Sequence, residues 1–206
     1  MIEPLFCNLD DRSIVYRSVS DLFGVCTYFL VDQEKVIIVD PGRLSEEVYH
    51  WLEQFKAHKK IIYLTHEHFD HHYDVNKLLA FENTAAFSIS IDFEQAIKCG
   101  RKNLSYYYNT PIESVLSKQT EFNFFEIIVT PGHSKFSVCF MYKNMLFGGD
   151  TVIEKENLVL KLPGSNKIDY KESIDKIKNL TSKNTIVLPG HGNLFLFNNW
   201  FKISNQ

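Results

Sequence analysis

Short runs of apolar, branched and aromatic residues recur along the chain, separated by polar turns. Runs of this length and composition are typical of β-strands. They predict strands at residues 13–17, 25–31, 35–39, 61–64, 84–89, 124–129, 136–142, 145–147 and 185–188. Because strands are spread over most of the length, a sheet-containing fold is expected.

Between these runs, apolar residues recur at the spacing of an α-helix. The spacing predicts helices at residues 44–58, 73–82, 91–99, 111–118 and 169–180. In the last of them, Ile174, Ile177 and Leu180 would form the apolar face, with lysines and acids elsewhere. Since no linker or repeat divides the chain, we predict one layered α/β domain over residues 1–206.

The composition of the 206 residues is that of a globular protein, with 45% hydrophobic and 14% aromatic residues. A net charge of −3 gives no basic footprint of the kind that nucleic-acid binding usually leaves, so a small-molecule substrate is expected rather than nucleic acid. No apolar stretch has the roughly 18 residues of a membrane span, so no membrane partner is expected. The four cysteines are scattered and the amino-terminal residues do not resemble a secretory signal, which predicts a cytoplasmic protein. The oligomeric state is left open.

Residues that bind metal ions follow four of the predicted strands. The motif His66-x-His68-x-Asp70-His71 follows residues 61–64, and three further candidates follow later strands. Ligands at the carboxyl ends of strands can converge on one edge of a sheet although they are far apart in sequence. The candidate metal ligands are His66, His68, Asp70, His71, His133, Asp150 and His191.

The spacing within this set favours two ions. His66 and His68 stand two residues apart, so in an extended segment both side chains project in the same direction toward one ion. Asp70 and His71 follow, where a turn can direct them to a second ion. Asp150 comes alone from a separate strand and is the best candidate for a carboxylate shared by both ions.

Neighbouring polar residues have simpler explanations. Glu67 would point away from His66 and His68 in an extended segment, so we expect a structural role for it. His72 is expected to support the site or to face solvent.

At these residues the sequence resembles the metallo-β-lactamase-fold hydrolases, and within them the glyoxalase II-like (hydroxyacylglutathione hydrolase-like) proteins. The motifs that carry the resemblance are Thr65-His66-Glu67-His68-Phe69-Asp70-His71, Thr130-Pro131-Gly132-His133-Ser134, Gly149-Asp150-Thr151, Pro189-Gly190-His191-Gly192 and Val39-Asp40-Pro41-Gly42. They lie within residues 25–192, so the resemblance covers most of the chain. It implies a four-layer αββα sandwich, in which Asp40 supports the metal-binding loop from behind.

The resemblance also implies how the ligands are shared. It gives His66, His68 and His133 to the first ion, Asp70, His71 and His191 to the second, and Asp150 to both. The cofactors would be two divalent ions, with zinc expected and iron or manganese as alternatives. Hydroxide held by the two ions would attack an acyl carbon, most simply of a thioester or related ester, and Asp70 would orient the nucleophile or pass its proton as the catalytic residue.

Some features separate this chain from glyoxalase II. Those enzymes carry a Cys-Gly-Lys-Phe-Tyr-like run after the bridging aspartate, where this chain has residues 151–155, Thr-Val-Ile-Glu-Lys. Glutathione recognition is therefore not carried over. Two alternatives stay open: a mononuclear iron sulfur (persulfide) dioxygenase of the same fold, and a metal-stabilised binding protein without turnover.

The segment 91–118 contains Tyr106, Tyr107 and Tyr108 and lies between metal-binding strands. It would form either a helical cover with tyrosines at the mouth of the site or a solvent-facing helical hairpin.

Overall fold

The computed structural model describes residues 1–8, 13–110, 112, 124–154 and 159–198. They group into two compact units. Unit 1 comprises Met1–Leu64 and His68–Glu121, and unit 2 comprises Thr65–Glu67 and Phe122–Gln206. The single-domain organisation stays a prediction.

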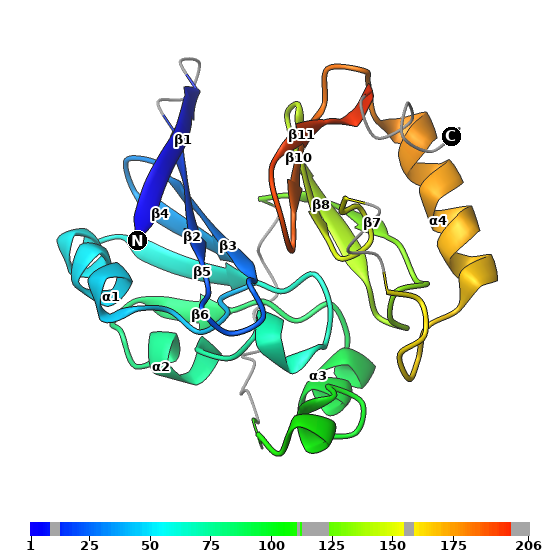
Figure 1. The fold of residues 1–206 in the computed structure, drawn as a ribbon. Helices are drawn as coiled ribbons and strands as arrows, with labels where there is room; N and C mark the ends of the chain where they lie inside the picture. The colour runs from blue at the N-terminus through cyan, green and yellow to red at the C-terminus, as the bar shows by residue number, and fades with distance from the viewer. Residues whose placement is uncertain (9–12, 111, 113–123, 155–158, 199–206) are drawn as a thin grey trace. The chain divides into compact units, whose positions relative to one another are not determined.

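Unit 1 is built on a six-stranded mixed sheet, drawn from blue to green in Figure 1. The strands pair in sequence order, antiparallel from the first to the fourth and parallel from the fourth to the sixth. Their bounds are β1 (Ile2–Asn8), β2 (Ser13–Val19), β3 (Cys26–Val31), β4 (Lys35–Val39), β5 (Lys59–Tyr63) and β6 (Thr84–Ala86). All six residues of β3 are buried, which explains why this strand reads as a continuous apolar run rather than an alternating one.

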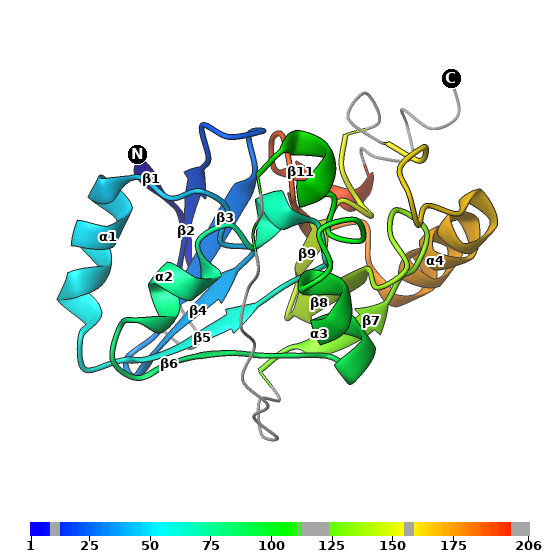
Figure 2. The same ribbon diagram turned by 90° about the horizontal axis from the view of Figure 1, so that it is seen from below.

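Helices α1 and α2 lie beside this sheet on the same side (Figure 2). The helical segments of unit 1 are α1 (Glu46–Leu52), α2 (Val75–Leu79) and α3 (Ile91–Ile97), with 3₁₀ turns η1 (Glu53–Phe55), η2 (Phe69–His71) and η3 (Ser105–Tyr108). Trp51 of α1 packs its ring against Tyr16 and Phe29, at centroid distances of 4.9 and 5.4 Å. These aromatic contacts fix α1 on β2 and β3.

Unit 2 contains a five-stranded mixed sheet with the order β11-β10-β9-β8-β7. Its strands are β7 (Glu126–Val129), β8 (Val138–Tyr142), β9 (Met145–Gly149), β10 (Ile186–Pro189) and β11 (Phe195–Leu196). β9 and β10 are parallel, and the other pairs are antiparallel. The parallel pair places the ends of β9 and β10, which precede Asp150 and His191, at the same edge of the sheet.

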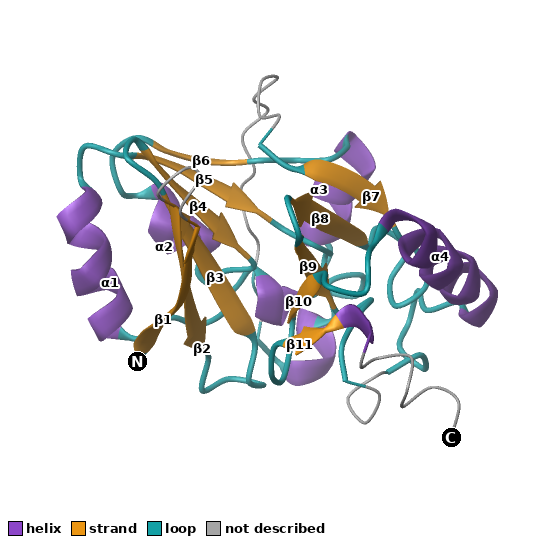
Figure 3. Cartoon of the chain, turned by 90° about the horizontal axis from the view of Figure 1, so that it is seen from above, coloured by secondary structure: helices purple, strands orange, loops and turns teal. Residues whose placement is uncertain are grey.

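Helix α4 (Lys167–Leu180) packs on this sheet (Figure 3). Asn166 caps its first turn, because the Asn166 side chain accepts from the backbone N–H groups of Ile168 and Asp169. The core beneath it includes Ile174 and Ile177 together with apolar residues of the strands. The predicted place of Leu180 on the apolar face was wrong, since its side chain is 50% exposed at the last turn of the helix.

The nine predicted strands all match strands of the structure, with shifted ends. β1 and β11 were not predicted. The helix predicted at 44–58 is shorter, because the chain leaves α1 at Leu52 and passes through η1 into β5. The helix predicted at 111–118 lies outside the described residues, apart from Ile112.

Candidate metal centre

The seven candidate ligands are divided between the two units. The division runs through the H-x-H-x-D-H motif, between Glu67 and His68. Unit 1 contains His68, Asp70 and His71, and unit 2 contains His66, His133, Asp150 and His191. Within each unit the structure gives the geometry of these side chains.

In unit 1, Asp70 and His71 lie on the single turn η2, which follows β5 along the chain after residues 64–68. The His71 side chain is fully buried, and its Nδ1 atom lies 3.1 Å from Oδ2 of Asp40. Nε2 of His71 lies 3.9 Å from Oδ2 of Asp70. A carboxylate at Nδ1 favours the tautomer with its proton there, which leaves the lone pair of Nε2 for a metal ion.

Asp40 is held by a strained turn. Its φ of 51° is in the left-handed region, which a non-glycine residue seldom adopts without a surrounding structure that imposes it. Thr27 imposes the turn: its Oγ1 donates to the Asp40 carbonyl at 2.8 Å and accepts from the N–H of Gly42 at 3.1 Å. A Cβ on Gly42 would lie 3.0 Å from the Asp70 carbonyl oxygen, so the small residue lets the two loops approach. The support of the metal-binding loop by the Asp-Pro-Gly turn is confirmed.

His68 and His72 are also buried in unit 1. His68, with 3% of its surface exposed, precedes η2 in extended conformation. His72 is fully buried, so it does not face solvent, and of its two predicted roles only support of the site is left.

In unit 2, Asp150 stands between two histidines. Its Oδ2 atom lies 3.5 Å from Nε2 of His133 and 3.4 Å from Nε2 of His191. These distances exceed those of a good N–H···O hydrogen bond, roughly 2.7–3.2 Å. Two ligands placed about 2.0 Å from one tetrahedral ion are about 3.3 Å apart. The spacing of these three side chains therefore fits metal ligands better than hydrogen-bond partners.

The rings of His133 and His66 are oriented by contacts at their Nδ1 atoms. Nδ1 of His133 lies 3.0 Å from the carbonyl oxygen of Val159, and Nδ1 of His66 lies 3.1 Å from Oγ1 of Thr65. The two rings meet edge to face at 5.0 Å between centroids, with ligand nitrogens within 4.8 Å of one another. As with His71, the Nε2 side of the His133 ring is left to coordinate a metal.

Glu67 points away from these ligands. Its buried carboxylate accepts a hydrogen bond of 2.6 Å from Oγ of Ser134, which in turn lies 2.9 Å from Oγ of Ser137. The predicted structural role of Glu67 is confirmed, since it ties the H-x-H-x-D-H motif to the loop that carries His133. These contacts of Ser134 and Ser137 were not anticipated from the sequence.

The donor set fits divalent metal ions. Imidazole nitrogens and carboxylate oxygens suit zinc, iron and manganese. In each of His66, His71 and His133, a contact at Nδ1 orients the ring. These ligands are buried, with 0% to 3% exposure for His71, His66, His133 and His68, and burial of ring nitrogens is costly unless hydrogen bonds or a metal ion satisfy them.

A search against family models matches residues 21–191 to the metallo-β-lactamase superfamily. The chain belongs to this superfamily. A crystal structure of the BLEG-1 B3 metallo-β-lactamase matches with a TM-score of 0.72, covering 98% of this chain and 97% of that one at 23% identity. The predicted metallo-β-lactamase fold, with its α/β class, is therefore confirmed.

Curated relatives in the superfamily have modest identity. A probable metallo-hydrolase of Streptococcus pyogenes is 27% identical over 86% of this chain and 83% of its own length. The probable polyketide biosynthesis zinc-dependent hydrolase PksB of Bacillus subtilis is 28% identical over 75% of this chain and 66% of its own length. Hydroxyacylglutathione hydrolase 1 of Vibrio vulnificus is 29% identical over 77% of this chain, and the match spans 59% of that enzyme. The predictions of a metal-binding hydrolase superfamily and of glyoxalase II-like relatives are confirmed.

The tyrosine segment of this superfamily member lies in unit 1. Tyr106, Tyr107 and Tyr108 are 61%, 58% and 51% exposed. The Tyr108 ring packs against Phe69 of η2 at 5.4 Å and against Phe23 at 5.0 Å. The segment is thus joined to the metal-binding turn, and its action as a cover stays a prediction.

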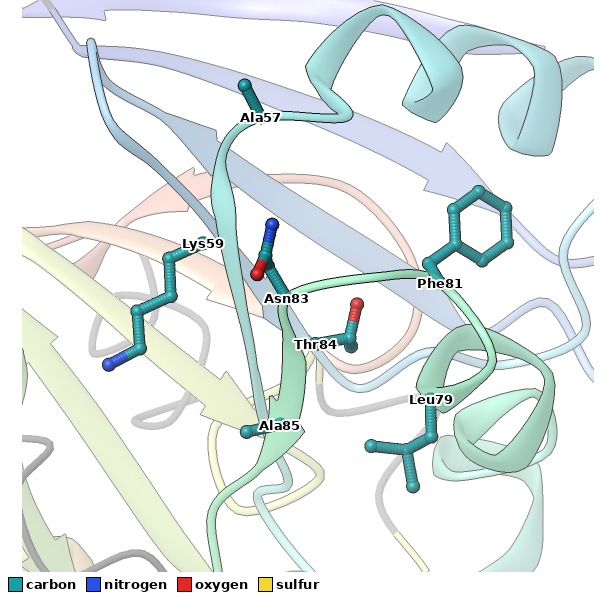
Figure 4. A pocket seen from close by; sticks show the side chains of 7 residues that line it. All are labelled: Ala57, Lys59, Leu79, Phe81, Asn83, Thr84 and Ala85. Carbon is teal, nitrogen blue, oxygen red and sulfur yellow. The ribbon is translucent and has the colours of Figure 1, made fainter.

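A groove in unit 1 lies away from the motif (Figure 4). It is lined by Ala57, Lys59, Leu79, Phe81, Asn83, Thr84 and Ala85. Lys59 begins β5 and Thr84 begins β6, so the groove is at the amino ends of these strands, whereas the motif follows the carboxyl end of β5.

Among the helices that the structure describes, none combines the length and the hydropathy that a membrane span requires.

Proposed function

We propose that the chain is a dinuclear metallohydrolase that cleaves a thioester or related ester. The observation that carries the proposal is the position of Asp150, whose Oδ2 lies within 3.5 Å of Nε2 of both His133 and His191. Because this one oxygen stands at ligand spacing from two histidines that the sequence assigns to different ions, Asp150 could be the ligand that both ions share. Membership of the superfamily supports the same conclusion.

We assign the ligands of the two ions as the sequence predicts. The first ion takes His66, His68 and His133, the second takes Asp70, His71 and His191, and Asp150 serves both. Along the chain, only Glu67 separates His66 from His68. Zinc is the expected metal, since the Bacillus relative is named as zinc-dependent. Iron and manganese suit the same donors.

When bound, two divalent ions supply an activated water and a charge that stabilises the oxyanion formed at the substrate carbonyl. The chain's own residues must then hold the reactants. Asp40 fixes the His71 ring, and Asp70, whose side chain is 17% exposed, can orient the attacking water and accept its proton at a carboxylate oxygen. A thiolate can leave without a strong acid to protonate it, which suits a site with no other evident proton donor.

The thioester assignment draws on the Vibrio relative, which is named as a hydrolase of a glutathione thioester. Glutathione itself is not proposed, because the recognition run after Asp150 is replaced by Thr151-Val152-Ile153-Glu154-Lys155. We propose a small-molecule substrate rather than nucleic acid, in line with the net charge of −3. A cytoplasmic location also stays a prediction.

Metal analysis of protein purified without added metal, combined with a hydrolysis panel, tests the proposal. The panel contains thioesters, esters, lactones, β-lactams and phosphodiesters. We expect two metal ions per chain and the highest kcat/KM on a thioester or ester. A single iron with oxygen consumption on a persulfide and no hydrolysis would instead establish the dioxygenase alternative. Two metals without turnover on any substrate would leave a binding protein.

A further inference from the structure

The loop that carries His133 is held by helix α4 and the residues just before it. Four backbone carbonyls between residues 129 and 133 accept hydrogen bonds from this element. The pairs are Ser165 Oγ with the His133 oxygen at 2.8 Å, Asn166 N with the Gly132 oxygen at 2.8 Å, Ser173 Oγ with the Pro131 oxygen at 2.7 Å and Lys176 Nζ with the Val129 oxygen at 2.9 Å. The backbone path into His133 is therefore fixed by α4.

Tyr170 of α4 lies against this loop at Gly132. A Cβ built on Gly132 would lie 2.3 Å from Cα of Tyr170 and 2.6 Å from its Cβ. Gly132 also has a φ of 141°, which disfavours any other residue. The backbone of Tyr170 thus sits directly against the residue before His133.

The side chain of Tyr170 reaches the second metal-binding turn of unit 2. Its hydroxyl donates to the carbonyl oxygen of Thr151 at 3.1 Å, and Thr151 directly follows Asp150. Burial raises the pKa of Tyr170, so the hydroxyl keeps its proton and acts as a donor. The same two turns are joined again by the hydroxyls of Thr130 and Thr151, 3.3 Å apart.

We propose that Tyr170 is a positioning residue for the metal centre. Its backbone packs against the His133 turn while its hydroxyl holds the Asp150 turn, so it helps to set the spacing between His133 Nε2 and Asp150 Oδ2. This inference rests on the proposed binding of metal by these two residues. Residues that orient ligands without touching the ion affect metal affinity, commonly by 10- to 100-fold.

The competing explanation is that Tyr170 only fills the core, since its ring packs against the apolar cluster that contains Ile174, Ile177 and Val187. Tyr170→Phe separates the two explanations, because it keeps the ring and removes the hydroxyl. Tyr142→Phe is the matched control in the same unit. Tyr142 is the last residue of β8 and pairs with Met145, whereas Val138 begins the strand. The substitution therefore deletes a hydroxyl at the end of β8 that is farther along the chain from His133.

The experiment measures zinc affinity by competition with a chromophoric chelator, the visible spectrum of the cobalt-loaded protein and the unfolding midpoint of the metal-free protein. For Tyr170→Phe we expect about tenfold weaker zinc binding and an altered cobalt spectrum. The midpoint of the metal-free protein should fall by no more than about 3 °C, as one lost hydrogen bond gives in a chain of this size. Tyr142→Phe should match the wild type in affinity and spectrum.

Wild-type zinc affinity and cobalt spectrum in Tyr170→Phe would overturn the inference. It would also be overturned if the loss of affinity came with partial unfolding of the metal-free variant and an unchanged cobalt spectrum. The outcome does not depend on the substrate. If the protein binds metal but hydrolyses no ester or thioester, the proposed function is refuted and the positioning role of Tyr170 still stands. A wild-type protein that binds no metal overturns both.

Discussion

Oδ2 of Asp40 lies 3.1 Å from Nδ1 of His71, and both side chains are buried. Thirty-one positions separate the two residues, so this pair joins the Asp-Pro-Gly turn to the metal-binding motif. The carboxylate orients the imidazole and increases its basicity as a ligand.

We predict that Asp40→Asn weakens metal binding about tenfold, because the substitution removes the charge beside His71. Asparagine is chosen because it tolerates the left-handed φ of 51° at this position. Competition titration with a chelator measures the effect. Asp92→Asn, at an exposed position of α3, is the control and should bind metal as the wild type does. Equal affinities in the two variants would contradict the role of Asp40.

Whether a residue of the site could be predicted from the sequence depends on how far along the chain its interaction partner lies. The ligands were found because each lies in a short motif directly after an apolar strand. Tyr170 and Ser134 were not found, because they act on partners 19 and 67 positions away. A backbone carbonyl or a carboxylate accepts a hydrogen bond from many donor types, so no residue pattern marks such contacts.

The missed strands have a similar physical explanation. β1 contains Glu3 and Pro4 and, among the described strands, pairs with β2 alone, so it has neither a continuous apolar run nor a clear alternation. β11 has two residues, which is too short for any pattern. At the end of α4, helical spacing continues to Leu180, but the sheet beneath it does not cover that residue.

We predict that Asp150→Ala loses both metal and turnover. Removing the carboxylate leaves the Nε2 atoms of His133 and His191, which now lie 3.5 and 3.4 Å from its oxygen, without a shared charged ligand. Metal analysis and hydrolysis of the best substrate from the panel measure the two losses. Asp175→Ala, on the surface of α4, should retain both. Activity retained in Asp150→Ala would refute the shared-ligand assignment.

We predict that Tyr108→Ala lowers the free energy of unfolding by about 1 kcal/mol, because it removes ring contacts with Phe69 and Phe23. Urea unfolding measures the change. Tyr107→Ala is the matched control, since the ring of Tyr107 contacts that of the exposed Tyr106, and a smaller effect is expected. Turnover in the same variants tests the cover. If single substitutions at 106, 107 and 108 leave kcat and KM unchanged, the segment is a solvent-facing hairpin.

The last prediction concerns the pH dependence of stability and the buried Lys60. The side chain of Lys60 is 1% exposed, and its Nζ donates to the carbonyl oxygens of Lys56, His58 and Glu82 at 3.2–3.5 Å. Burial lowers the pKa of Lys60 below its ordinary value of 10.5. Between the lowered pKa and 10.5 the unfolded chain binds more protons at this residue than the folded chain, so this group makes stability rise with pH in that window.

Lys60→Met should remove this dependence, because methionine has similar length and no charge. Urea unfolding of the metal-free protein from about pH 7 to pH 10 measures it. We expect the stability of the wild type relative to Lys60→Met to increase as the pH approaches 10.5. Lys59→Met is the control, because Lys59 is the exposed neighbour on β5 and should leave the shape of the pH profile unchanged. A stability difference between the wild type and Lys60→Met that stays constant over this range would show that burial does not shift the titration of Lys60.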